Sequence, residues 1–299
     1  MSQLPAYTPS QRLVWLFGAG ASRDTHDAMV ASGAQVLIQD LEDFTPPVLR
    51  PQARAMAPEL FRAARLAGSM VCVRINPLDQ EGLVDLAAVM PHRPDVIAYP
   101  KAERAIDMAA LAEQITRLEQ QHGLVLGQTE ILPVCETALG VVEVRTLAAA
   151  TPRVRAALLG TEDLATDLQA ERGQDGLELD HARRRFLLEC RAARIEPVDA
   201  PYTFADVEGA VAETRYSRRL GYQTKSLVNP AMVRAVQSAL APSVEDVTLA
   251  RETVTLFEQA RARGEDRALV QGLWVEVPTY LNARRLLDRA QALTSQEAR

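Results

Sequence analysis

The sequence predicts an α/β fold, a (β/α)8 TIM barrel with a C-terminal helical extension, on three observations. The 299 residues are enough for one α/β barrel with a large core. Short apolar segments alternate with helix-compatible segments about eight times before residue 240, as a barrel of this class requires. Polar and ionisable residues follow most of the apolar segments, at the strand ends where barrel enzymes carry their chemistry. On periodicity alone, a doubly wound open sheet is the alternative.

The predicted strands are short apolar segments bounded by polar residues, glycine or proline. Six of them are residues 13–17, 36–38, 70–75, 95–99, 196–200 and 226–228. The other two lie within 131–140 and 156–168, where each apolar segment runs into a carboxylate, Glu136 or Asp163. The helices predicted between the strands are residues 24–32, 53–67, 105–121, 181–193 and 207–220. Among these, 105–121 shows the clearest amphipathic pattern.

The pattern changes after Pro242, which sets the predicted domain limits. We expect an N-terminal tail at 1–11, the barrel at 12–241 and the extension at 242–299. In the extension, Ser243 begins a helix that covers 247–263, and Gly264 ends it before the segment 269–277 and a final helix at 280–293. An eight-unit barrel has no place for this tail, so we expect it to pack on a neighbouring subunit.

Composition excludes several classes of partner. The net charge is −6 and no basic cluster is interleaved with aromatic residues, so nucleic acid is not expected to bind. The three cysteines are scattered and form no CxxC pair, which is typical of buried hydrophobic residues in a reducing compartment. No apolar run approaches the roughly 18 residues of a membrane span, and the N-terminus lacks a signal pattern. We therefore expect a cytoplasmic protein with no membrane partner.

The candidate site residues are charged side chains that directly follow predicted strands. They are Asp40, Glu42 and Asp43 after the second strand, Arg74 in the third, Glu136 after the fifth and Asp163 after the sixth. Because parallel strands of a barrel end at the same rim, these groups are expected to converge. Carboxylates gathered in this way repel one another and take up protons unless a cation neutralises them.

This donor set favours Mg²⁺, which binds through one or two carboxylates together with water and substrate oxygens. Zinc is disfavoured because the four histidines are far apart in the sequence. A substrate carboxylate and an adjacent hydroxyl or keto oxygen would complete the magnesium site, and the metal would act as Lewis acid. Arg74 could then stabilise an enolate oxygen by a charge-assisted hydrogen bond. This combination suits reversible cleavage of a carbon–carbon bond through an enolate.

Several segments, in their order and spacing, match one family. They are Asp40-Leu41-Glu42-Asp43, Val73-Arg74-Ile75-Asn76-Pro77, Pro100-Lys101-Ala102-Glu103, Glu136-Thr137-Ala138-Leu139-Gly140, Gly160-Thr161-Glu162-Asp163 and Asn229-Pro230-Ala231. The chain resembles the citrate lyase beta subunit and malyl-CoA lyase family of the phosphoenolpyruvate/pyruvate superfamily, from about Arg12 to Arg289. The resemblance implies a TIM barrel with a C-terminal extension, a homotrimer or homohexamer, and Mg²⁺. By position it implies that Glu136 and Asp163 bind the metal, that Arg74 contacts the thioester or enolate oxygen, and that Glu42 and Asp43 surround the metal's waters.

The chain also departs from the family pattern. The loop at 17–24 lacks both prolines of the family's CoA-binding loop and carries Asp24 where arginine is expected, so Arg23 is the candidate for this substrate contact. Arg23 also occupies the place of the third glycine in a dinucleotide motif, which argues against a nucleotide cofactor. Glu276 stands where the family has an aspartate that reaches an adjacent subunit. Asn229 replaces a histidine.

The expected function is a Mg²⁺-dependent lyase that cleaves a 3-hydroxyacyl thioester, such as malyl-CoA or citramalyl-CoA, into an acyl-CoA and a 2-oxo acid. One alternative is a family member that acts on a hydroxy acid without CoA, and another is a non-catalytic barrel subunit. The assigned roles are catalysis for Arg74, Glu42 and Asp43, substrate binding for Arg74, Glu136 and Arg23, and metal binding for Glu136 and Asp163. The general base stays open among Asp40, Glu42, Asp43 and a metal-bound water.

Overall fold

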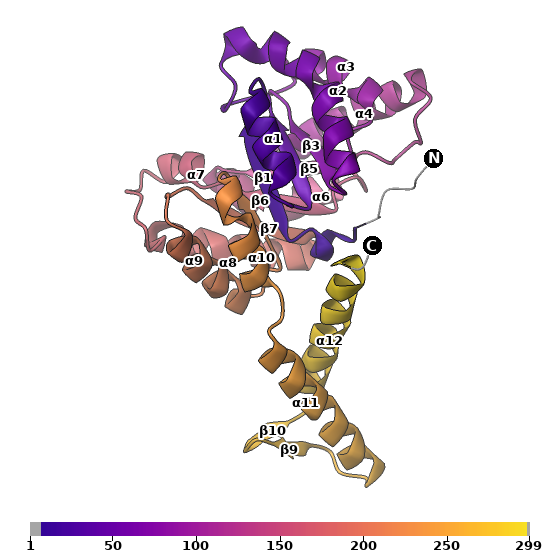
Figure 1. Ribbon diagram of the computed structural model, residues 1–299, viewed down its shortest axis with the longest axis vertical. Coiled ribbons are helices and arrows are strands. Elements are labelled where there is room, and N and C mark those ends of the chain that lie inside the picture. The colour runs from indigo at the N-terminus through magenta and orange to yellow at the C-terminus, as the bar shows by residue number, and fades with distance from the viewer. Residues whose placement is uncertain (1–6, 298–299) are drawn as a thin grey trace. The chain divides into compact units, whose positions relative to one another are not determined.

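Eight parallel strands close into a barrel in the computed structural model of the chain, which describes residues 7–297 and the side chains of 7–294 (Figure 1). Each strand pairs with the next in sequence, and β8 pairs with β1. The strands are β1 (Val14–Ala19), β2 (Val36–Asp40), β3 (Met70–Arg74), β4 (Val96–Tyr99), β5 (Glu130–Cys135), β6 (Ala156–Leu159), β7 (Glu196–Tyr202) and β8 (Thr224–Leu227). The predicted TIM barrel is confirmed, and the doubly wound sheet is excluded.

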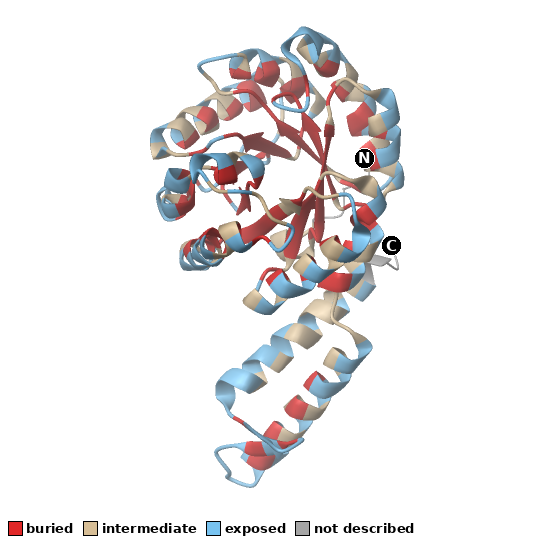
Figure 2. Cartoon of the chain, turned by 90° about the vertical axis from the view of Figure 1, so that its left-hand side faces the viewer, coloured by how far each residue is buried: buried red, intermediate tan, exposed pale blue. Residues whose placement is uncertain are grey.

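Helices connect consecutive strands and cover the outside of the barrel. They are α1 (Arg23–Ala31), α2 (Arg50–Leu66), α3 (Gly82–Val89), α4 (Ala105–Gln121), α5 (Ala138–Val142), α6 (Val144–Ala149), α7 (Glu162–Asp167), α8 (Leu177–Ala193), α9 (Val207–Leu220) and α10 (Val233–Leu240). The predicted limits of 105–121 and 207–220 agree with α4 and α9. Figure 2 shows these helices buried on their inner faces and exposed on their outer faces, as amphipathic helices around a sheet should be.

The barrel interior is filled by alternate residues of the strands, because successive side chains of a strand point to opposite faces. Trp15 and Phe17 from β1, Val36 and Ile38 from β2, and Val198 from β7 belong to one buried apolar cluster. The residue after Val198, Asp199, is buried on the other face, toward α8, where it accepts a bond from Arg183. The strand ends above this interior cluster therefore stand on a rigid packed base.

The chain divides into two compact units, Met1–Gln237 and Ser238–Arg299. Of the predicted tail 1–11, residues 1–6 lie outside the described part, and Pro9–Gln11 forms a short 3-10 helix. No helix in the described residues is long and apolar enough to cross a membrane.

The second unit is a pair of helices joined by a hairpin. Helix α11 (Val244–Ala262) begins at Ser243, whose side chain accepts a bond from the backbone of Asp246. Strands β9 (Ala268–Val270) and β10 (Leu273–Val275) form an antiparallel hairpin, and α12 (Val277–Glu297) follows. The sequence had not specified a hairpin at 269–277; its two-residue turn, Gln271-Gly272, has φ of 48° and 81°, the left-handed backbone that a tight hairpin turn needs.

Candidate active site

The carboxyl ends of the strands surround a cavity of about 310 Å³. Four predicted site residues line it: Asp43, Arg74, Glu136 and Asp163. Glycine and polar residues that also line it are Gly160, Thr161, Glu162 and Thr203, and the apolar side chains are Phe17, Phe44, Val134, Leu158, Pro201 and Val228. The rim therefore brings together groups separated by as many as 120 residues in the sequence, which is the convergence that parallel strands predict.

Arg74 is the fixed cation of the cavity. Its Nε and Nη2 donate to the two carboxylate oxygens of Asp40 at 3.0 and 2.5 Å, a bidentate contact. The guanidinium also lies 5.2 and 5.6 Å from the ring centres of Phe17 and Phe44. Burial disfavours its charged form, but the attraction of Asp40, Glu42 and the carboxylate of Glu136 outweighs burial and raises the pKa of Arg74. The side chain is therefore charged and oriented before any ligand arrives.

Asp40 serves to orient its neighbours. It is fully buried, and besides Arg74 it accepts bonds from the backbone N–H groups of Glu42 at 2.8 Å and Phe44 at 3.3 Å. These contacts fold the loop after β2 back onto the strand end. The carboxylate of Asp40, the last residue of β2, therefore holds Arg74 and the following loop in place. Asp43 lines the cavity with a half-exposed side chain.

Glu136 is a buried carboxylate that lines the cavity directly after β5. Its Oε1 accepts the backbone N–H of Lys101 at 2.9 Å, and its Oε2 lies 3.9 Å from Nη1 of Arg74. Burial raises the pKa of Glu136 to about 7, against the opposing attraction of Arg74. Gly160 is required beside it, because a Cβ at that position would lie 2.3 Å from the Cβ of Glu136.

Lys101 contacts three carboxylates of the site. It was not among the predicted site residues. Its Nζ lies 3.3 Å from Glu42 Oε1, 3.5 Å from Asp163 Oδ2 and 3.9 Å from Asp43 Oδ2. Its backbone has φ of 44°, a left-handed conformation that is uncommon outside glycine. Burial raises the pKa of Glu42, although Arg74 opposes the shift. Glu42 is thus held by two cations, since Nη1 of Arg74 is 3.0 Å from its Oε2.

The donors present fit a Mg²⁺ ion. Among the described residues, no group of three or more His, Cys, Asp or Glu side chains is arranged to enclose a metal. Four carboxylates nevertheless line one cavity, and two of them are the predicted metal ligands Glu136 and Asp163. Magnesium commonly takes only one or two protein carboxylates and fills its remaining positions with water and substrate oxygens. A two-carboxylate site open to a cavity therefore suits this ion better than one that needs a closed protein cage.

Three other sequence candidates lie elsewhere. Arg23 does not line the cavity, and its guanidinium binds the carboxylate of Glu59 on α2 at 2.8 and 2.5 Å. The side-chain Oδ1 of Asn229 accepts the backbone N–H of Ala231 at 3.0 Å and caps a short 3-10 helix. Glu276 is an exposed residue that follows β10 in the second unit. The roles predicted for Arg23 and Glu276 remain predictions.

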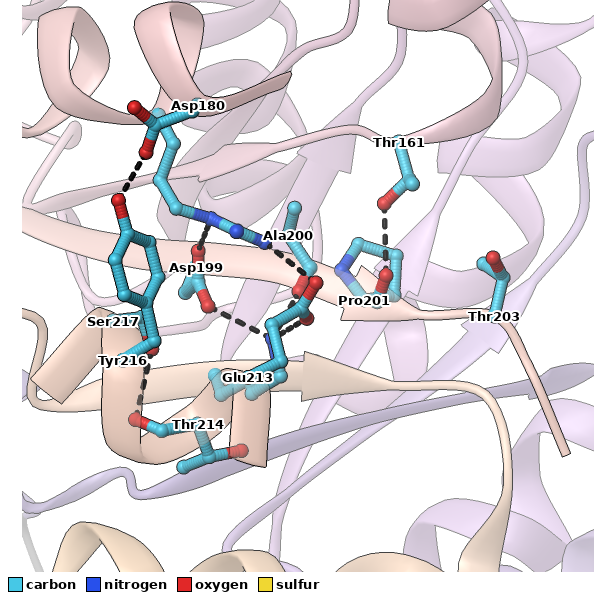
Figure 3. A network of polar contacts seen from close by, with 12 residues as sticks. Thr161, Asp180, Asp199, Ala200, Pro201, Thr203, Glu213, Thr214, Tyr216 and Ser217 are labelled. Atoms are coloured by element: carbon cyan, nitrogen blue, oxygen red, sulfur yellow. Dashed lines mark hydrogen bonds and ion pairs between the residues drawn. The ribbon is translucent and has the colours of Figure 1, made fainter. Parts of the chain in front are cut away.

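A buried charge network supports one wall of the cavity (Figure 3). Strand β7 contains one extra residue relative to β8, since Asp199 pairs with Lys225 but Tyr202 pairs with Leu227. This irregularity leaves the carbonyl of Ala200 outside the ladder, and the ammonium of Lys225 donates to it at 2.7 Å.

The same ammonium donates to Asp199 at 2.8 Å and to Glu213 at 2.7 Å, and Arg183 donates to Asp199 at 2.8 Å. On the other side of the irregularity, Thr161 donates to the carbonyl of Pro201 at 2.9 Å. Side chains from two elements thus hold the segment that places Pro201 at the cavity.

Comparison with known proteins places the chain in a family. The model of the HpcH/HpaI aldolase/citrate lyase family matches residues 13–230. The chain belongs to this family. It is 34% identical over 262 residues to the citrate lyase subunit beta of Leuconostoc mesenteroides subsp. cremoris, covering 87% of each protein. It is 30% identical over 305 residues to an L-malyl-CoA/beta-methylmalyl-CoA lyase of Cereibacter sphaeroides, covering 94% of this chain and 95% of the relative.

A solved structure of the family shows the same fold. The CitE protein of Mycobacterium tuberculosis, in complex with magnesium, acetoacetate and coenzyme A, superposes with a TM-score of 0.75 at 28% identity. The superposition covers 93% of this chain and 98% of that one. The resemblance inferred from the strand-end segments is therefore confirmed over nearly the whole chain.

Proposed function

We propose that the protein is a Mg²⁺-dependent carbon–carbon lyase that cleaves a 3-hydroxyacyl-CoA thioester, such as malyl-CoA or citramalyl-CoA, into an acyl-CoA and a 2-oxo acid. The observation that carries the proposal is the pairing of a fixed cation with two carboxylates in one cavity: Arg74, locked by Asp40, beside Glu136 and Asp163. The named lyases among the relatives, and the magnesium and coenzyme A in the CitE structure, support it.

Glu136 and Asp163 would hold the Mg²⁺. When bound, the ion would polarise the oxygens of the 2-oxo acid portion of the substrate. It would also offset negative charge in the cavity, where burial has already raised the pKa of Glu136 to about 7.

The side chains of this chain account for the other steps. Asp43 lines the cavity with an exposed carboxylate, and we propose that it accepts the proton of the 3-hydroxyl group. The C2–C3 bond then breaks, the hydroxyl carbon becomes the carbonyl of the 2-oxo acid, and the electron pair moves onto the thioester as an enolate. Arg74 stabilises the enolate oxygen through its Nη1, the guanidinium nitrogen that pairs with Glu42 and does not bind Asp40. The proton that Asp43 accepted then returns to C2 of the enolate, which restores the carboxylate and releases the acyl-CoA.

The test is product release from a panel of hydroxyacyl-CoA thioesters. With Mg²⁺ we expect glyoxylate or pyruvate to form from at least one member, and EDTA should stop the reaction. Glu136→Gln should abolish release while circular dichroism stays unchanged. Glu113→Gln, an exposed residue on α4, is the matched control and should remain active. Absence of release from every member would refute the proposal and favour a non-catalytic subunit.

A hydroxy acid without CoA is the second enzymatic alternative, motivated by the altered 17–24 loop. Tight calorimetric binding of a CoA thioester would exclude it. We further propose a cytoplasmic homotrimer or homohexamer. The three buried free cysteines, Cys72, Cys135 and Cys190, suit a reducing compartment, and light scattering of the purified protein tests the assembly.

A further inference from the structure

The chain uses lysine at only two positions, although lysine and arginine together number 33. Lys225 is fully buried in the network beneath β7. Lys101 stands at the edge of the candidate active site with 44% of its side chain exposed. Lysine differs from arginine in carrying a compact charge on a flexible stem, without a planar fork to fix it. The edge of the site therefore has one cation on a flexible stem, beside the fixed guanidinium of Arg74.

The contacts of Lys101 are looser than those of the arginines around the cavity. Its single side-chain hydrogen bond, to Glu42, is 3.3 Å long, and its other carboxylate contacts are 3.5 and 3.9 Å. Arg74 is bound bidentately to Asp40, and Arg172 is held by Glu178, by Glu162 and by a bond to Thr203 at 3.2 Å. Within the described residues, Lys101 is thus the cation at this rim that can leave most easily.

The backbone of Lys101 is fixed at the site, while its ammonium is held only by carboxylate side chains. The backbone N–H of Lys101 donates to Glu136, and the end of its side chain lies near the carboxylates of Glu42 and Asp163. The ammonium therefore lies against Asp163, one of the two proposed metal ligands. A divalent cation bound to Glu136 and Asp163 would compete for the same negative charge and repel the ammonium.

We propose that Lys101 exchanges with the divalent cation: the bound ion releases the ammonium from the carboxylates, and the released ammonium binds the carboxylate of the 2-oxo acid portion of the substrate. The inference rests on the proposed function, because it takes Glu136 and Asp163 as the metal ligands. It assigns to Lys101 a place in substrate binding that leaves Arg74 available for the thioester oxygen. Without the exchange, the ammonium stays neutralised by three protein carboxylates and offers little to an anionic ligand.

The small number of lysines makes the exchange directly measurable. Acetic anhydride labels amines, and mass spectrometry separates Lys101 from Lys225 and the N-terminus. We expect the labelling rate of Lys101 to rise several-fold when Mg²⁺ replaces EDTA, and to fall again when pyruvate or glyoxylate is added. Lys225 is the internal reference and should stay unlabelled in all three conditions because it is fully buried. An unchanged or slower rate with Mg²⁺ would overturn the proposal.

A substitution separates the exchange from a structural role. In Lys101→Met, calorimetry should show Mg²⁺ binding about tenfold tighter, since weak, partly exposed ion pairs no longer compete. Binding of pyruvate or glyoxylate to the magnesium form should become at least about tenfold weaker, since one charge-assisted contact is lost. Arg104→Met is the control, because it removes the same charge from an exposed residue that pairs with Asp107. It should change neither the dissociation constant of Mg²⁺ nor that of pyruvate or glyoxylate.

Opposite shifts of the two constants support the exchange, and a loss of both affinities would overturn it in favour of a structural role. None of these measurements requires turnover. If the shifts appear while no thioester is cleaved, the proposed lyase activity fails and the exchange stands; if thioesters are cleaved without the shifts, the exchange fails alone.

Discussion

Replacement of Gly160 by alanine tests whether the position of Glu136 governs the site. The added Cβ would lie 2.3 Å from the Cβ and 3.1 Å from the Cα of Glu136, whereas ordinary contact begins at 3.4 Å. The added Cβ would therefore be about 1.1 Å too close to the Cβ of Glu136. Rotation of the Glu136 side chain does not move this atom. One of the two elements, the end of β5 or the segment after β6, must move by about this amount.

We expect Gly160→Ala to reduce activity more than it reduces the stability of the fold. Overpacking of this kind destabilises a protein by roughly 1–3 kcal/mol. A displacement of about 1 Å at a reacting group can cost on the order of a hundredfold in rate. We therefore expect Gly160→Ala to remain folded, to bind Mg²⁺ more weakly by calorimetry, and to lose about two orders of magnitude in thioester cleavage.

The control for this variant is Gly173→Ala, whose Cβ would meet the flexible carboxylate end of Asp175 at 2.9 Å. It should retain both metal binding and activity. Wild-type magnesium affinity in folded Gly160→Ala would refute the reasoning, because it would show that Glu136 either does not move or does not bind the metal.

Two further predictions concern the network that supports β7. Lys225→Met leaves Asp199 and Glu213 with one cation fewer and the carbonyl of Ala200 without its donor, so we expect a loss of about 3–5 kcal/mol, the usual cost of breaking a buried ion pair. By calorimetry this is a melting temperature lowered by roughly 6–20 °C, and a change below about 2 °C would contradict it. The second prediction is acid sensitivity: burial raises the pKa of Asp199, but Arg183 and Lys225 outweigh burial and lower it. A folded pKa below the unfolded value of about 3.9 gives stability that is present above that pH and is lost as the pH falls through the folded pKa. Urea unfolding between about pH 6 and 3 should therefore show a smaller loss of stability in Asp199→Asn than in the unaltered protein.

The sequence specified the barrel and most of the rim because both depend on local patterns. An apolar run that ends in Glu136 indicates a buried strand and a polar strand end without knowledge of its neighbours. By contrast, Asp40, Glu42 and Asp43 are equivalent in the sequence, three carboxylates within four residues. Only the burial of Asp40 and its bond to Arg74 on the next strand separate the orienting residue from the one that faces the cavity.

The residues that the sequence did not specify depend on contacts between distant elements. The predicted strand 196–200 stops short of Pro201, a residue with no backbone N–H to give to a ladder, whereas β7 runs to Tyr202. The strand continues to Tyr202 because Lys225 and Thr161, from elsewhere in the chain, satisfy the carbonyls at the irregularity. By sequence pattern Lys101 is one charge in a loop, and the signal that sets it apart is the rarity of lysine in this arginine-rich chain.

The net charge around the cavity indicates in which order the metal and the substrate bind in the proposed exchange at Lys101. Five carboxylates, those of Asp40, Glu42, Asp43, Glu136 and Asp163, surround Arg74 and Lys101, and the neighbouring pair of Glu162 and Arg172 adds no net charge. When all are ionised, the excess is three negative charges, which repels an anionic substrate. A divalent ion would reduce the excess to one and, in the proposed exchange, would leave the ammonium of Lys101 available to an anionic ligand. The metal must therefore bind first, and a 2-oxo acid should bind measurably to the magnesium form but not to protein kept in EDTA.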